Sequence, residues 1–271
     1  MTGTFGRCSG LGRLVAQKDL ISLCDCSQVD QSVTEQTDQR MDLRPTRRVL
    51  NAGSGPPGRD TLHPAFDRSL WAELRIDIDP RNEADFVGSI CDMRSVIEDA
   101  SFDAVWSSHC IEHLHDHEVL PALGEFRRIL RDDGIAVINC PNIDAIAKSL
   151  VSEDIESVAY LSPAGPVRLL DMMFGHSLSI EAGRVHMAHK TGFTADRLGR
   201  VATRAGFAEA RVLEGENYDL WGVLMMPRAE LSVLAAFFAG TDFAALFHDQ
   251  ISPSAVAPQA GRRKRVRILG A

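Results

Sequence analysis

The sequence predicts an α/β fold, a three-layer domain in which helices cover both faces of a mostly parallel, doubly wound sheet of seven strands. Two observations predict it. From Arg48 onward, short apolar runs typical of buried strands alternate with segments whose apolar residues recur at helical spacing. In addition, the chain has 271 residues, 45% of them hydrophobic, which is enough to bury the core of such a domain.

The expected strands are short apolar runs, and their order along the chain indicates how they pair. They cover 48–52, 73–78, 85–87, 102–107 and 135–140, and then 208–213 and 220–226. Strands that alternate with helices pair in parallel through crossover connections, and the helices then lie on the faces of the sheet. The sheet is therefore expected to be mostly parallel and covered on both faces.

Three longer helices are expected where apolar residues recur every three or four positions. The first begins at Asp116, a suitable N-cap, and continues to Leu130. The second covers 194–205, with Thr194 as its N-cap and Gly206 as its stop. The third covers 230–247 and is amphipathic.

The chain is expected to have three parts. Residues 1–40 are rich in Gly, Ser, Thr, Gln and Asp and show no sustained period, which is typical of a flexible extension. The domain itself is expected over 41–250, and 251–271 is expected to be a loose basic tail. Within the domain, 143–190 is long for a plain connection and is predicted to form a helical cap over an acceptor site. The candidate residues for that wall are Tyr160, Met172, Met173, Phe174 and His176.

Charge and composition exclude several classes of protein. The formal net charge is −8, and the positive run Arg262–Arg267 makes the rest of the chain still more acidic. An acidic body argues against a broad nucleic-acid surface, and the basic run is interpreted as solvated. No apolar run reaches the roughly 18 residues of a membrane span, and no secretory signal is seen, so a cytoplasmic location is expected. The six cysteines match no zinc site and are expected to be reduced thiols. The oligomeric state stays open.

A glycine-rich turn directly follows the first expected strand. It contains Gly53, Gly55 and Gly58, and glycine lets the backbone turn tightly and approach a ligand closely. The spacing also fits the dinucleotide fingerprint, so an NAD-dependent dehydrogenase is an alternative at this point. Asp77 ends the second strand about twenty residues later, where a carboxylate can accept hydrogen bonds from both hydroxyls of a ribose. Asp79 is expected to cap the turn at Pro80 instead.

Three further segments follow in order, at 88–93, 101–105 and 109–114, the last reading His-Cys-Ile-Glu-His-Leu. Together with the glycine turn and Asp77, this set resembles the class I S-adenosylmethionine-dependent methyltransferases, and most closely their type 11 group. The resemblance implies a Rossmann-like methyltransferase fold, the cofactor S-adenosyl-L-methionine, and methyl transfer to a small-molecule acceptor such as a sugar, a metabolite or a natural-product intermediate. An NAD-dependent dehydrogenase would leave the 109–114 segment unexplained, so this hypothesis becomes a remote alternative.

The resemblance also implies which residues bind the cofactor. The glycine turn would surround the methionine part, Asp77 would hold the ribose, and the 88–93 segment would line the adenine. The implied residues are Asn51, Gly53, Ser54, Gly55, Asp77, Ile78, Ser89, Ile90, Asp92, Met93, Ser108 and His109. Two positions depart from the family pattern, because Asn51 and Ser89 stand where acidic residues are usual. These departures keep a second hypothesis open, a non-catalytic cofactor-binding or scaffold protein.

Histidines are the candidate catalytic residues, because the pKa of an imidazole lies near neutrality. His109 is the first candidate, since it follows the fourth strand, and His113 is the second. The chain also holds His115, His117 and His189, which raises the question of a metal. No set of these residues has a diagnostic metal-ligand spacing, so the sequence predicts no metal site.

Overall fold

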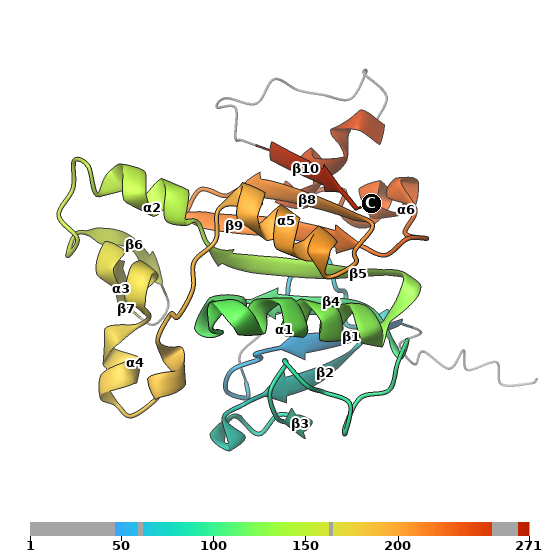
Figure 1. Ribbon diagram of the computed structural model, residues 1–271, viewed down its shortest axis with the longest axis horizontal. Coiled ribbons are helices and arrows are strands. Elements are labelled where there is room, and N and C mark those ends of the chain that lie inside the picture. The colour runs from blue at the N-terminus through green and yellow to red at the C-terminus, as the bar shows by residue number, and fades with distance from the viewer. Residues whose placement is uncertain (1–46, 59–61, 163–164, 251–264, 271) are drawn as a thin grey trace, which may run out of the picture. The chain divides into compact units, whose positions relative to one another are not determined.

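The computed structural model describes residues 47–58, 62–162, 165–250 and 265–270. The predicted flexible extension over 1–40 lies outside these residues. In the described chain, eight strands form one sheet, in the order β10-β8-β9-β5-β4-β1-β2-β3 (Figure 1). The strands are β1 Arg47–Ala52, β2 Trp71–Asp77, β3 Phe86–Val87, β4 Phe102–Ser108, β5 Leu130–Pro141, β8 Glu209–Glu214, β9 Asp219–Met225 and β10 Arg265–Leu269.

The sheet is parallel on one side and antiparallel on the other. Strands β3, β2, β1, β4 and β5 pair in parallel, whereas β9, β8 and β10 pair in antiparallel fashion. The chain moves outward from β1 to β2 and β3 and then returns to the other side of β1 as β4. The connections that leave β1 and β4 therefore diverge, and such a reversal opens a crevice at the carboxyl ends of the strands.

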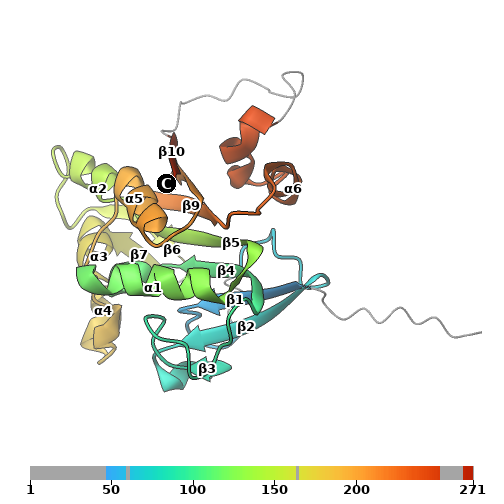
Figure 2. The ribbon, with the colours of Figure 1, turned by 45° about the vertical axis from the view of Figure 1, so that its right-hand side comes forward.

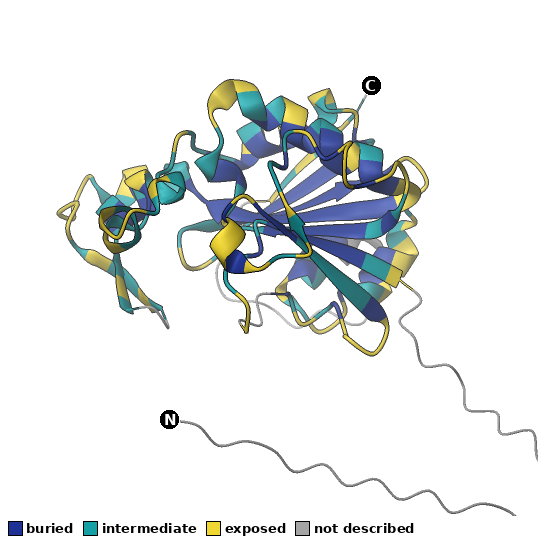
Figure 3. Cartoon of the chain, turned by 90° about the horizontal axis from the view of Figure 1, so that it is seen from below, coloured by how far each residue is buried: buried dark blue, intermediate teal, exposed yellow. Residues whose placement is uncertain are grey.

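Most of the sheet is buried (Figure 3), because apolar side chains pack on both of its faces. On one face lie α1 Asp116–Ile129 and α5 Ala195–Arg204, which bury Leu123, Phe126 and Leu198 against the strands. On the other face lie α6 Leu231–Phe237, η4 Asp242–Gln250 and the turns that carry Phe66 (Figure 2). The predicted three-layer, doubly wound α/β class is confirmed.

The predicted helix ends are partly right. Thr194 caps α5 by accepting a hydrogen bond from the backbone N–H of Arg197, and Gly206, with φ +96°, follows its end. The N-cap of α1 is His115, one residue before the expected cap Asp116, which is already helical. The predicted helix over 230–247 is wrong as a single element. Gly240 adopts φ +78° and separates α6 from η4.

The prediction of a loose tail over 251–271 is wrong for its last part. Residues 265–269 form β10, an edge strand that pairs with β8. Its alternating side chains explain this, since Ile268 packs against Gly199 of α5 and Arg267 forms an ion pair with Glu209 at 2.6 Å. The strand adds an eighth member to the predicted seven. Most of the basic run before it lies outside the described residues.

The predicted cap over 143–190 is not purely helical. Its helices are α2 Ile143–Ser149, α3 Leu169–Phe174, α4 Ser177–Glu181 and η3 Val185–Met187, and between them β6 Val158–Ser162 and β7 Gly165–Arg168 form a separate hairpin. A small core holds these pieces together and contains Ile146, Leu169 and Met172. The segment lies beside the carboxyl ends of the parallel strands (Figures 1 and 2).

Among the described residues, every helix is too short or too polar to span a membrane.

Candidate functional site

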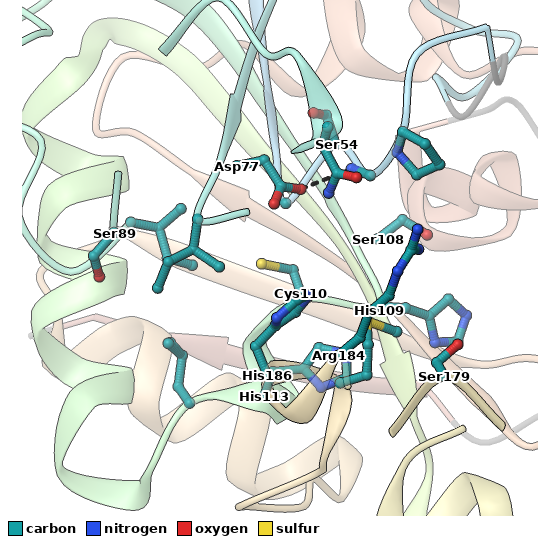
Figure 4. A pocket seen from close by; sticks show the side chains of 18 of the residues that line it. Ser54, Asp77, Ser89, Ser108, His109, Cys110, His113, Ser179, Arg184 and His186 are labelled. Atoms are coloured by element: carbon teal, nitrogen blue, oxygen red, sulfur yellow. Dashed lines mark hydrogen bonds between the residues drawn. The ribbon is translucent and has the colours of Figure 1, made fainter. Parts of the chain in front are cut away.

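A cavity of about 490 Å³ opens at the carboxyl ends of β1, β2 and β4, where the strand order reverses. Cavities of roughly 300–1,000 Å³ are typical of small-molecule sites. The wall on the sheet side comes from the connections after these strands, and residues 176–190 form the opposite wall. Figure 4 shows Asp77 and Ser54 on one side of this space and His113, Arg184 and His186 on the other.

The glycine turn and Asp77 form one unit at the head of the cavity. Gly53 and Gly55 have φ values of +71° and +68°, which side-chain-bearing residues rarely adopt. The backbone N–H of Gly55 donates to Oδ2 of Asp77 at 2.8 Å, and the N–H of Asp79 donates to Oδ1 at 2.9 Å. These two bonds hold a carboxylate that is only 6% exposed, and each of its oxygens keeps a further lone pair.

Asp79 has a different role from Asp77, as its place before Pro80 predicts. Its carboxylate accepts hydrogen bonds from the backbone N–H and the guanidinium of Arg81, and so caps η1 Pro80–Asn82. The hydrogen bonds from Arg81 lower the pKa of Asp79 to about 2. The carboxylate of Asp79 is therefore paired with Arg81, whereas Asp77 lines the cavity.

Two polar oxygens in the cavity wall are buried and accept no hydrogen bond from any described residue. They are Oγ of Ser54 and Oδ1 of Asn82. Buried polar atoms in folded proteins are nearly always paired, so unpaired ones beside a cavity indicate a polar ligand. Asn51, at the end of β1, instead donates its amide N–H to Oε1 of Glu73 at 2.8 Å.

Most of the predicted cofactor residues lie together on the cavity wall. They are Asn51, Gly53, Ser54, Gly55, Asp77, Ile78, Ser89, Ile90, Ser108 and His109. Asp92 and Met93 do not line it, which corrects the prediction for both. Met93 is fully buried in the core, and the Asp92 side chain is 68% exposed beside Arg94. The turn after Ser89 carries these two residues away from the cavity.

The two candidate catalytic histidines also line the cavity. His109 follows β4 with φ +49°, and its Nδ1 lies 3.3 Å from Oε1 of Glu112. Burial lowers the pKa of His109, but the neighbouring carboxylate of Glu112, with the charge of Asp219, raises that pKa by more. The pKa of His109 is therefore raised overall. His113 lies beside the backbone of Ala188, with Nδ1 3.3 Å from the carbonyl oxygen.

The sequence interpretation missed most of the opposite wall. Of the proposed acceptor residues, His176 lines the cavity, whereas Tyr160, Met172, Met173 and Phe174 do not. The residues that do line it are polar or basic, namely Ser179, Arg184, His186 and Lys190, together with Met187. Three of them, Arg184, His186 and Lys190, are basic residues that follow α4 closely in the sequence, and this clustering could have indicated them.

Comparisons with known proteins agree with this arrangement. Residues 50–138 match the model of a family described as a methyltransferase domain, of the type 11 group. No curated protein matches the chain. The matched stretch contains the glycine turn, Asp77 and the 109–114 segment, so it covers the sheet-side wall of the cavity.

Several solved structures are similar to the chain. One is a SAM-dependent methyltransferase from Archaeoglobus fulgidus, with 16% identity, a TM-score of 0.40, and 64% of this chain and 66% of that chain covered. Another is a 1,6-didemethyltoxoflavin-N1-methyltransferase from Burkholderia thailandensis with bound 1,6-didemethyltoxoflavin and S-adenosylhomocysteine, with 18% identity, a TM-score of 0.41, and 68% and 72% covered. A third is an arsenic(III) S-adenosylmethionine methyltransferase from Chlamydomonas reinhardtii, with 18% identity, a TM-score of 0.45, and 68% and 65% covered.

The chain thus spans just under two thirds of the Archaeoglobus and Chlamydomonas structures. The matched residues 50–138 also include the ends of β2 and β4. The chain therefore contains, over residues 50–138, a region that matches a methyltransferase domain of the type 11 group.

Proposed function

We propose that this enzyme moves the methyl group of S-adenosylmethionine, bound at the glycine turn and Asp77, to a small-molecule acceptor bound between the sheet and residues 176–190. The observation that carries the proposal is the hydrogen bond from Gly55 N–H to Asp77 at 2.8 Å, which joins the two motifs in one cavity wall. It fixes the carboxylate and still leaves lone pairs for two ribose hydroxyls.

The residues around Asp77 fit such a cofactor. The unpaired oxygens of Ser54 and Asn82 would accept hydrogen bonds from its polar groups. Ile78, which is 59% exposed at the cavity, and the buried Ile90 offer apolar surfaces on which a flat adenine ring would pack. When bound, S-adenosylmethionine supplies an electrophilic methyl group on a sulfonium sulfur.

The acceptor would bind on the side of His109 and the basic residues. Arg184 and Lys190 line the cavity there, and both carry positive charge at neutral pH. Their presence favours a small acceptor with a polar or anionic group. His109 would hydrogen-bond to the nucleophilic atom and orient it, and positioning alone supplies much of the rate in such transfers. A pocket of this volume encloses a small molecule rather than a folded protein or a duplex.

Labelled methyl transfer tests the proposal. The chain is incubated with methyl-labelled S-adenosylmethionine and a mixture of metabolites, sugars and natural-product precursors. We expect the label in the small-molecule fraction. Asp77→Ala should lower transfer at subsaturating cofactor about tenfold or more, because leaving buried polar partners unpaired costs about 1–3 kcal/mol.

Asp92→Ala is the matched control, since it removes an aspartate between β3 and β4 that does not line the cavity. Its transfer rate should equal that of the unmodified chain. Equal losses in both variants would contradict the role of Asp77, and label found only in protein or nucleic acid would contradict the acceptor class.

A further inference from the structure

Three side chains of metal-ligand type meet behind the cavity wall. Glu112, His113 and His189 each offer a ligand atom, and these atoms all lie within 4.8 Å of one another. Glu112 and His113 belong to η2 Ile111–His113, after β4, and His189 belongs to the end of the cap segment. The fold thus brings together residues that are far apart in the sequence.

The carboxylate of Glu112 lacks the partners that a buried charge needs. Glu112 is 1% exposed, and neither of its carboxylate oxygens accepts a hydrogen bond from a described residue. Nδ1 of His109 lies 3.3 Å from its Oε1. A buried carboxylate is costly unless it is paired or coordinates a metal, so this pair of oxygens indicates a missing ligand.

The two imidazoles are held in the orientation that metal ligands require. Nδ1 of His189 lies 2.9 Å from the carbonyl oxygen of Met172, and Nδ1 of His113 lies 3.3 Å from that of Ala188. Because a carbonyl oxygen only accepts, each Nδ1 carries the hydrogen and each Nε2 keeps its lone pair. A histidine that binds a metal through one nitrogen usually donates the other N–H to such an acceptor.

Backbone hydrogen bonds hold the two segments against each other. The N–H groups of Lys190 and Thr191 donate to the carbonyl oxygen of Glu112, at 2.9 and 3.3 Å, and the N–H of His189 donates to that of Phe174. The rings of His113 and His189 meet edge to face, with centroids 4.9 Å apart. The cluster is therefore built into the fold and is not an accident of exposed side chains.

We propose that Glu112, His113 and His189 bind one divalent metal ion of the zinc type. Two neutral imidazoles and one carboxylate are ligands that Zn²⁺, Co²⁺ and Fe²⁺ accept, and three protein ligands leave a position open. Bonds of about 2.0–2.2 Å at tetrahedral angles place ligand atoms about 3.4 Å apart, and the three ligand atoms lie within 4.8 Å of one another. Side-chain rotation would bring the three ligand atoms to that separation when the ion binds.

The position of the site indicates what the ion would do. His113 also lines the cavity, so the ion would lie next to the proposed acceptor space. A metal there would act as a Lewis acid that binds and polarises an acceptor oxygen. This catalytic use rests on the proposed function, whereas metal binding itself does not.

Titration of the chelator-treated chain with Zn²⁺ and Co²⁺ tests the proposal, by calorimetry and by the visible absorption of Co²⁺. We expect one ion per chain, and at least about a hundredfold weaker binding in Glu112→Gln and His189→Ala, since even residues that only support ligands contribute 10–100-fold. His117→Ala is the control, because His117 belongs to a different pair, stacked on His115 with centroids 5.7 Å apart. Its metal affinity should not change.

Two outcomes would overturn the metal site. In the first, the unmodified chain binds Zn²⁺ or Co²⁺ no more tightly than the double variant Glu112→Gln/His189→Ala. In the second, all variants bind the metal with equal affinity. In either case the imidazole of His109 would be the partner of Glu112. A thermal shift with S-adenosylhomocysteine, measured without metal, shows that each variant is folded. It also tests the proposed cofactor site separately, so failure of one proposal is distinguishable from failure of the other.

Discussion

Gly53→Ala is expected to lower affinity for S-adenosylmethionine at least tenfold and to destabilise the fold. Gly53 has φ +71°, and an added Cβ would lie 2.4 Å from Sγ and 2.7 Å from Cβ of Cys110. The left-handed backbone costs roughly 1–2 kcal/mol for a residue with a side chain, and overpacking adds about 1–3 kcal/mol. Binding by calorimetry and unfolding by urea measure both effects.

Gly58→Ala is the matched control for this substitution. Gly58 has a similar φ of +78°, but no atom lies within 4 Å of its added Cβ. It should therefore show only the backbone cost. The double variant Gly53→Ala/Cys110→Gly, which removes the clashing atoms, should recover part of the loss. If Gly53→Ala were no worse than Gly58→Ala, the close approach of the turn to Cys110 would be refuted.

Glu125→Ala is expected to destabilise the chain by about 3–5 kcal/mol, the usual cost of breaking a buried pair by removing one partner. The Glu125 side chain is 7% exposed and accepts two hydrogen bonds from the guanidinium of Arg128, at 2.8 and 2.9 Å. It also accepts the backbone N–H of Met93 at 2.7 Å. Because this bond anchors the connection that carries Ser89 and Ile90, cofactor affinity should fall as well.

The same carboxylate gives a pH dependence with a definite sign. The hydrogen bonds from Arg128 lower the pKa of Glu125 by more than burial raises it. A carboxyl group whose pKa is lower in the folded state stabilises the fold above its unfolded pKa, and this contribution is lost as the pH falls. The unfolding free energy should thus decrease below about pH 4.5 more steeply in the unmodified chain than in Glu125→Gln. Parallel curves for the two proteins would contradict the pairing.

The sequence predicts the parallel half of the fold well, for a physical reason. Strands β1 and β4 are largely buried and read as apolar runs, whereas β2 alternates apolar and charged residues. The ends of these three strands fix where Gly53, Asp77 and His109 lie. Strand β10 was missed because an edge strand with alternating arginines reads as a basic tail. Its strand character depends on Glu209 and Gly199, which belong to other elements.

Side-chain direction in the connections could not be predicted from sequence alone. Asp92 and Met93 follow Ser89 directly, but a turn carries them away from the cavity, and the partner that holds Met93 is the distant Glu125. The metal-type cluster was missed for a similar reason. Its spacing is not diagnostic in the sequence, and only the folding of the cap beside η2 brings His189 to His113.

The central claim is that the cavity at the ends of β1 and β2 holds S-adenosylmethionine or its product. Calorimetric titration of the unmodified chain with S-adenosylhomocysteine tests it most directly, because no acceptor is needed. The account predicts one binding site per chain and a raised melting temperature, both lost or strongly reduced in Asp77→Ala. The claim would be contradicted if the folded chain gave no heat of binding and no thermal shift.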